Sequence, residues 1–178
     1  NPVAVVQGSL YGTGKTTQTG IELTGIGDNN TNIVKDTVYE NVKKLVRGKS
    51  DSSKNATISG DFLCEGCETI PVGNEDETVL YVKGKDVTIS SDTTWNKNTI
   101  LIVDGGNLYI NGNLLYNESD PKIMTKKLGL VVIRNTEDQL KDAGNIYIAP
   151  TVTNIQAFAV VWGAIFSYDG DADMVTDT

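Results

Sequence analysis

The chain has 178 residues, of which 39% are hydrophobic, so it is long enough to build one domain around a core. Fifteen lysines and arginines against 23 aspartates and glutamates give a net charge of −8, which makes nucleic acid and anionic membrane surfaces poor partners. The sequence has no histidine. It therefore lacks the usual general base at neutral pH, the common Ser-His-Asp triad and any zinc site built on imidazole.

No apolar stretch is long enough to cross a bilayer. The longest candidate, residues 155–168, is too short and contains Gln156, so we expect no membrane insertion. The chain begins at Asn1 without a methionine or a basic leader, which fits a mature secreted protein or a piece cut from a longer one.

The first predicted element is an apolar strand at the start of residues 3–12, and a glycine-rich loop follows it. Gly12-Thr-Gly-Lys-Thr16 looks like a phosphate-binding loop, but the Walker A pattern requires a glycine where this chain has Ser9. We therefore expect Lys15 to be an exposed turn residue that binds no nucleotide.

Residues 13–78 are predicted to form a loop-rich insertion that carries one amphipathic helix. Its defining residues are Asp36 or Thr37 as the cap with Glu40, an apolar face of Val38, Val42 and Leu45, and Gly48 as the end. We expect this helix to cap an open end of the core or to cover an edge strand.

Cys64-Glu-Gly-Cys67 is the only cysteine pair in the chain. No thioredoxin-like pattern surrounds it, and a zinc site would lack two ligands. Because Gly66 permits a tight turn, the favoured interpretation is a local disulfide between Cys64 and Cys67, with reduced thiols as the alternative.

The segment from residue 79 onward repeats itself. Residues 79–90 align on 100–111 without a gap at an offset of 21. Leu130-Val-Val-Ile133 lies 30 residues after the start of that second unit, and Gly144-Asn-Ile-Tyr-Ile148 lies 38 after its counterpart, Gly106-Asn-Leu-Tyr-Ile110. Residues 159–167 match residues 4–12 at an offset of 155.

Each unit has an apolar first strand and an alternating second strand. Stacked in register, the aliphatic residues would form an inner ladder and Thr88, Tyr109 and Tyr147 an outer one. Gly84, Gly105 and Gly163 would stand at corners that need positive φ or close packing. The pattern predicts an all-β fold, a parallel β-solenoid with one short α-helix, and the alternative is an antiparallel β-sandwich.

Three sets of polar residues are candidate sites. The acidic end has oxygen ligands at alternate positions, as in half of a calcium loop, or is simply a solvated terminus; its residues are Asp169, Asp171, Asp173 and Asp177. N-glycosylation sequons stand in predicted loops at Asn29, Asn55 and Asn117. Asp86 and Asp104 lie at unit turns where stacking could pair two carboxylates, although turn aspartates more often accept backbone hydrogen bonds.

The apolar strand, glycine corner and Gly-Asn-aliphatic-Tyr-Ile phrase resemble β-solenoid proteins, including the bactofilin-like polymer-forming group and large surface proteins of uncultured bacteria. The resemblance covers residues 3–12 and 79–167, carries no catalytic residue and implies a structural or cell-surface role. We expect a single domain over residues 1–178, a non-enzymatic extracellular structural or adhesive module that self-associates through its terminal strands into filaments. The alternative is a carbohydrate-binding β-helix with a glycan partner, or a polysaccharide lyase or glycoside hydrolase.

Overall fold

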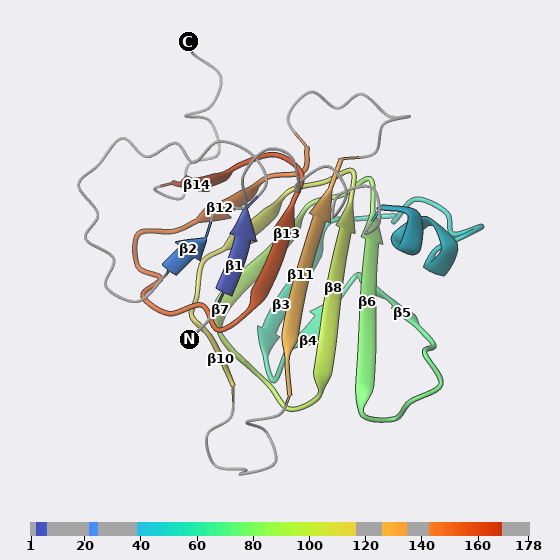
Figure 1. Cartoon of the computed structure of the whole chain (residues 1–178), viewed down its shortest axis with the longest axis horizontal. Coiled ribbons are helices and arrows are strands. Elements are labelled where there is room, and N and C mark those ends of the chain that lie inside the picture. Colours follow the sequence, from blue (N-terminus) through green and yellow to red (C-terminus); the bar gives the residue numbers. More distant parts are fainter. Residues whose placement is uncertain (1–2, 7–21, 25–38, 117–125, 135–142, 169–178) are drawn as a thin grey trace.

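The computed structural model describes residues 3–6, 22–24, 39–116, 126–134 and 143–168 (Figure 1). Within these ranges the fold is all-β, with one helix over residues 39–45. The strands are β1 Val3–Val6, β2 Glu22–Thr24, β3 Ala56–Gly60, β4 Leu63–Glu65, β5 Glu68–Ile70, β6 Glu77–Lys83, β7 Val87–Trp95, β8 Asn98–Asp104, β9 Leu108–Ile110, β10 Leu114–Tyr116, β11 Leu128–Ile133, β12 Ile146–Ile148, β13 Phe158–Val161 and β14 Ile165–Ser167.

The strands form two sheets. Sheet A has the order β2-β1-β13-β11-β8-β6-β5, and sheet B has the order β14-β12-β9-β7-β3-β4, with β10 also paired to β7. Successive units contribute one strand to each sheet: β6 is followed by β7, β8 by β9, β11 by β12 and β13 by β14. Neighbouring strands are parallel in both sheets, except for the antiparallel pairs β3–β4 and β5–β6.

Most of the predicted repeat offsets are confirmed by the strand register. Val79 pairs with Ile100 at the offset of 21, and Ile146 pairs with Leu108 at the offset of 38. The offset of 155 is also confirmed, because Val5 of β1 pairs with Val160 of β13. We expected the terminal strands to pair with a neighbouring subunit, but β1 and β13 pair with each other within one chain.

One predicted register is wrong by a single residue. Leu130 was aligned with Ile100, but it pairs with Leu101, and Gly129 lies beside Ile100 instead. A one-residue slip exchanges the two faces of a strand. Leu130 therefore points into the core with 1% of its surface exposed, whereas Ile100 faces outward and is 43% exposed.

The core lies between the two sheets. Alternate residues of sheet A, such as Leu101 and Val103, pack with Val87 and Leu108 of sheet B in one cluster of buried side chains. The aliphatic residues of the second strands form the inner ladder as predicted. This packing fixes which residues of each strand face outward.

The predicted corner glycines meet the two conditions expected of them. Gly84 and Gly105 have φ angles of 66° and 79°, in the left-handed region that side chains rarely adopt. Gly163 has no such angle, but a Cβ atom there would overlap the side-chain oxygen of Asn145. The repeat turns therefore require glycine at these positions.

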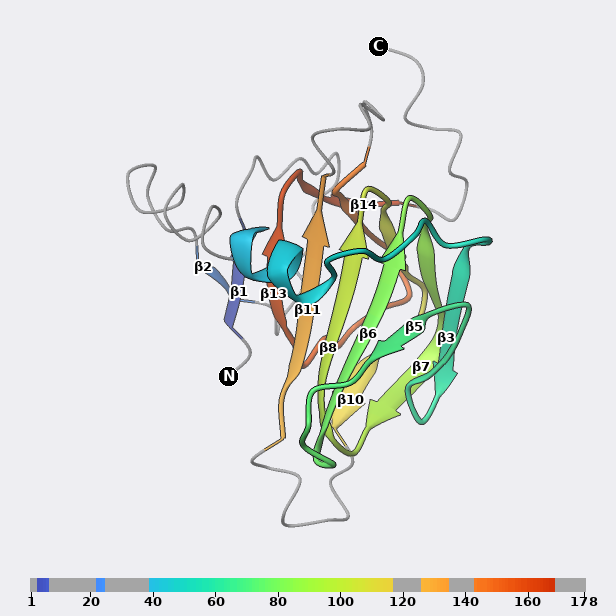
Figure 2. The same ribbon diagram turned by 90° about the vertical axis from the view of Figure 1, so that its right-hand side faces the viewer.

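The helix lies on the outer face of sheet A and does not cap an end of the core. Figure 2 shows it on the side of the sheet that faces away from β3 and β7. Val42 and Val46 are buried against Tyr81 and Ile102, whereas Leu45 is 39% exposed, so the predicted apolar face is rotated. Gly48 ends the helical region with φ of 78° as predicted, and Asp36, Thr37 and Val38 lie outside the described residues.

Residues 13–78 also contain strands that the sequence analysis did not predict. Strand β3 adds to β7 in sheet B, and the chain then reverses through β4 and β5. These two short antiparallel strands cover the outer edges of β3 and β6. Figure 2 shows β5 at one end of sheet A, with β1 and β2 at the other.

Candidate functional site

The stacked corners are held together by side-chain amides and carboxylates. At the corner between the sheets, the side-chain oxygen of one unit accepts a hydrogen bond from a backbone N–H of the next unit. Asn55 accepts from Asp86, Asp86 from Asn107, Asn107 from Asn145 and Asn145 from Ala164, at 3.2, 2.8, 3.1 and 3.0 Å. We call these residues the corner ladder.

A second, shorter ladder follows the same principle. Asp92 accepts from the N–H of Asn113 at 2.7 Å, and Asn113 accepts from the N–H of Asn154 at 2.9 Å. Each such bond satisfies a turn N–H that strand pairing leaves unpaired. The Gly-Asn phrase that recurs in two successive units supplies Asn107 and Asn145 and is the sequence signal for the corner ladder.

The two carboxylates considered for catalysis have different partners in the structure. Asp86 belongs to the corner ladder, where its neighbours are the amides Asn55 and Asn107. Asp104 is 9% exposed and accepts a hydrogen bond of 2.9 Å from the Tyr81 hydroxyl. These hydrogen bonds thus give the two carboxylates separate partners.

Tyr81 ties β6 to β8 beneath the helix, and only 1% of its surface is exposed. Burial is the main cause that raises its pKa above the usual 10.0, and the negative charge of Asp104 raises it further. Burial, with Asp86 nearby, raises the pKa of Tyr109 to about 12. In both residues the folded protein favours the neutral phenol.

The free energy of unfolding should therefore fall as the pH rises above about 10. A raised folded-state pKa means that the folded chain keeps protons which the unfolded chain releases at the usual tyrosine pKa of 10.0. This contribution is complete below pH 10 and is lost as the pH passes through the folded-state value. Denaturant titrations at a series of alkaline pH values should show a shallower decline for Tyr81→Phe; an equally steep decline would contradict this origin.

The predicted outer ladder on sheet B is confirmed. Thr88, Tyr109, Tyr147 and Phe166 are consecutive partners in the register, one from each unit. The Tyr147 ring stacks on Tyr109 at 5.0 Å and on Phe166 at 5.2 Å between centroids. Tyr168 covers two of these rings edge-on, so the aromatic residues form a closed stack and not an open groove.

The predicted disulfide is present as a bonded pair in the structure. Cys64 and Cys67 have their Cα atoms 5.6 Å apart, and Gly66 between them has φ of 95°. The bond joins Cys64 within β4 to Cys67, the residue immediately before β5, at the point where the chain crosses from sheet B to sheet A. The disulfide therefore constrains the connection between β4 and β5, the reversed strands that cover one end of both sheets.

The other end of sheet B has an open strand within the described part of the chain. Strand β14 pairs with β12 only. The Tyr168 N–H donates to Ile148, and the Ala164 carbonyl accepts from Ile146, so alternation directs the backbone groups of Ser167 away from β12. Strand β13 differs, because it has β11 on one side and β1 on the other.

The remaining predicted sites are placed as follows. Asn55 is exposed at the start of the corner ladder, whereas Asn29, Asn117 and the glycine-rich loop with Lys15 lie outside the described residues. The calcium candidates Asp169, Asp171, Asp173 and Asp177 also lie outside them. Among the residues that are described, no group of three or more acidic or cysteine side chains is arranged to hold a metal.

In that described part of the chain, no helix has the length and apolar character of a membrane span. Comparison with protein-family models, curated proteins and solved structures gave no match to this chain.

Proposed function

We propose that this chain is a non-enzymatic structural module, a parallel β-solenoid whose units stack end to end with those of other copies. The observation that carries the proposal is the register: successive repeat units pair in parallel in both sheets, and the first strand of the chain pairs in parallel with the last unit as well. The last unit also has an edge at β14 that no described strand pairs with, and this edge can accept a repeat strand from a second chain.

The pairing pattern supports a solenoid over the antiparallel sandwich. Strands of a sandwich joined by hairpins pair antiparallel, whereas here consecutive units pair parallel and, among the described strands, only the covering strands β4 and β5 run the other way. The corner ladder adds support, because it requires each unit to lie directly on the preceding one.

Among the described strands, β14 has a partner on one side only, and this open edge supports association. Ile165 and Phe166 continue the inner and outer ladders, so a further strand with an aliphatic and an aromatic residue would extend both. Unpaired backbone groups at such an edge are a template for strand addition. The opposite end is covered by β4 and β5, which favours growth at one end.

The cysteine pair supports an extracellular location. Disulfides persist in oxidising compartments, and the Cys64–Cys67 bond secures the covered end. An extracellular scaffold or adhesive module is therefore the role that we propose.

Ser167→Pro should abolish this association and leave the fold intact. Ser167 is exposed, and its N–H faces away from β12, so proline removes a donor and places its ring on the open edge without breaking a pair inside the chain. We expect the parent protein to sediment as larger species at rising concentration and the variant to remain monomeric.

Ser167→Ala is the matched control, since it keeps the N–H and should assemble like the parent. Both variants should unfold within about 0.5 kcal/mol of the parent. The proposal would be contradicted if the parent protein stayed monomeric while its concentration was raised about a hundredfold.

A further inference from the structure

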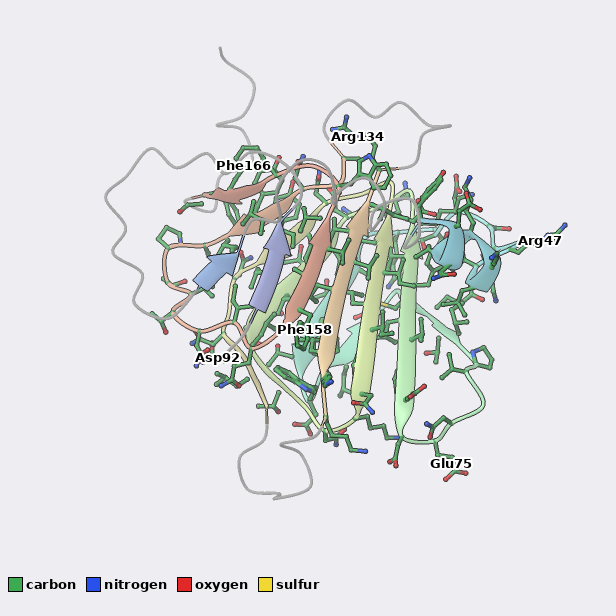
Figure 3. All side chains as sticks on the ribbon, in the orientation of Figure 1. Arg47, Glu75, Asp92, Arg134, Phe158 and Phe166 are labelled. Atoms are coloured by element: carbon green, nitrogen blue, oxygen red, sulfur yellow. A yellow bond between two sulfur atoms is a disulfide. The ribbon has the colours of Figure 1, made fainter. Side chains whose placement is uncertain are left out.

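The outer face of sheet A is only partly covered by the helix. The rows that contain Tyr81 and Ile102 lie beneath it, in the cluster with Val42 and Val46. The next row towards the start of the strands is open on β8 and β13, where Ile100 and Phe158 are 43% and 48% exposed, whereas Val79 on β6 is buried in the helix cluster. Figure 3 shows Phe158 on β13, on the same face.

This open row forms a groove across four strands. The register places Val79, Ile100, Gly129 and Phe158 side by side on β6, β8, β11 and β13. The groove has a volume of about 420 Å³, and Glu77 and Lys127 also line it. That volume lies within the range of sites for small ligands.

Gly129 makes the depression between the two exposed side chains. The fold does not require glycine there: its φ is not positive, and a Cβ atom would meet only Ile100 and Thr99 atoms at 3.7 Å or more. Gly106, by contrast, would place a Cβ on the backbone of Lys85. Glycine is unfavourable inside a strand relative to alanine, so the open space is not a by-product of the backbone path.

A polar row borders the apolar one. Glu77 pairs in register with Asn98, and the Lys127 N–H donates to the Asn98 side-chain oxygen at 3.0 Å. No ion pair joins the Glu77 carboxylate to the Lys127 ammonium in the described structure, whereas the neighbouring Lys126 is paired with Asp76. The negative charge of Glu77 and the positive charge of Lys127 leave the groove without net charge, and these side chains provide a hydrogen-bond acceptor and donors.

We infer that this groove binds a neutral saccharide. The exposed ring of Phe158 can take the C–H face of a sugar, and the polar row can accept from and donate to its hydroxyl groups. A hydrocarbon would bury the polar row without partners, and a polyion would meet a charge of its own sign. The site lies on a sheet face and is independent of the open edge at β14.

To test this, the whole chain is titrated with neutral hexasaccharides of glucose, galactose, mannose, xylose and N-acetylglucosamine. Binding is measured by calorimetry and by changes in the NMR chemical shifts of backbone amides. At least one should bind saturably and shift amides of β8, β11 and β13. Gly129→Val fills the groove with a residue that suits strands, and Phe158→Ala removes the ring; each should weaken binding by about tenfold or more.

Leu63→Ala is the matched control, because Leu63 is 70% exposed on β4 at the sheet edge, and it should change affinity by less than about twofold. The absence of saturable binding, or binding that Gly129→Val and Phe158→Ala leave unchanged, would overturn the inference. If Gly129→Val fails to fold, Phe158→Ala decides. Ser167→Pro should bind saccharide normally, so loss of assembly and loss of binding are distinguishable.

Discussion

Gly106→Ala should destabilise the protein by about 3 kcal/mol or more, or prevent folding altogether. Gly106 is buried at the corner between β8 and β9, and a Cβ atom there would overlap the carbonyl group of Lys85 in the preceding unit. The obstacle is backbone, which rotamer changes cannot relieve. Moving it would break the adjoining bonds of the corner ladder, where Asn107 donates to Asp86. Urea denaturation followed by circular dichroism measures the loss.

Gly129→Ala is the control for that substitution. The same change of side chain meets no atom closer than 3.7 Å, in a strand where alanine is favoured over glycine. We expect unchanged stability or a gain of up to about 1 kcal/mol. Equal losses at the two glycines would show that the units do not approach as closely at Gly106 as the structure indicates.

Leu101→Ala should cost about 2–5 kcal/mol, because the side chain is fully buried between the two sheets and its removal leaves a cavity. The adjacent Ile100→Ala removes an aliphatic side chain from the opposite face of the same strand, where 43% of it is exposed. We expect that change to cost about 1 kcal/mol or less. Thermal and urea unfolding of the two variants test the assignment of faces, and similar losses would contradict it.

These variants also separate the two proposed roles of the module. Association depends on backbone groups at the open edge of β14, and saccharide binding depends on side chains of one outer face. Ser167 lies on sheet B and Phe158 on sheet A, so each role can be removed without touching the other.

The sequence by itself determined the repeat and its consequences. The gap-free offset of 21 predicted which residues of β6 to β9 lie side by side, because identical local patterns of strand and corner stack best in register. Strict alternation in the second strands predicted the outer ladder of Thr88, Tyr109 and Tyr147. The corner glycines Gly84 and Gly105 and the local cysteine pair were also predictable, since their geometry depends on a few consecutive residues.

Only the tertiary structure decided the register of β11. The run Leu130-Val-Val-Ile133 has no alternation, so its pattern does not distinguish the inner from the outer face, and both faces are largely covered. The offset between β8 and β11 is 29 because Leu128 and Leu130 both pack in the core. This register places Gly129 beside Ile100, where the groove lies.

The rotation of the helix, the reversed strands β4 and β5, and the pairing of β1 with β13 have a common physical cause. Each depends on a surface built by residues far away in the chain: the outer face of sheet A, the edges of β3 and β6, and the free side of the last unit. Local sequence specifies strands and corners, but the partner of an edge or an apolar face is chosen by which other surfaces remain uncovered once the units have stacked.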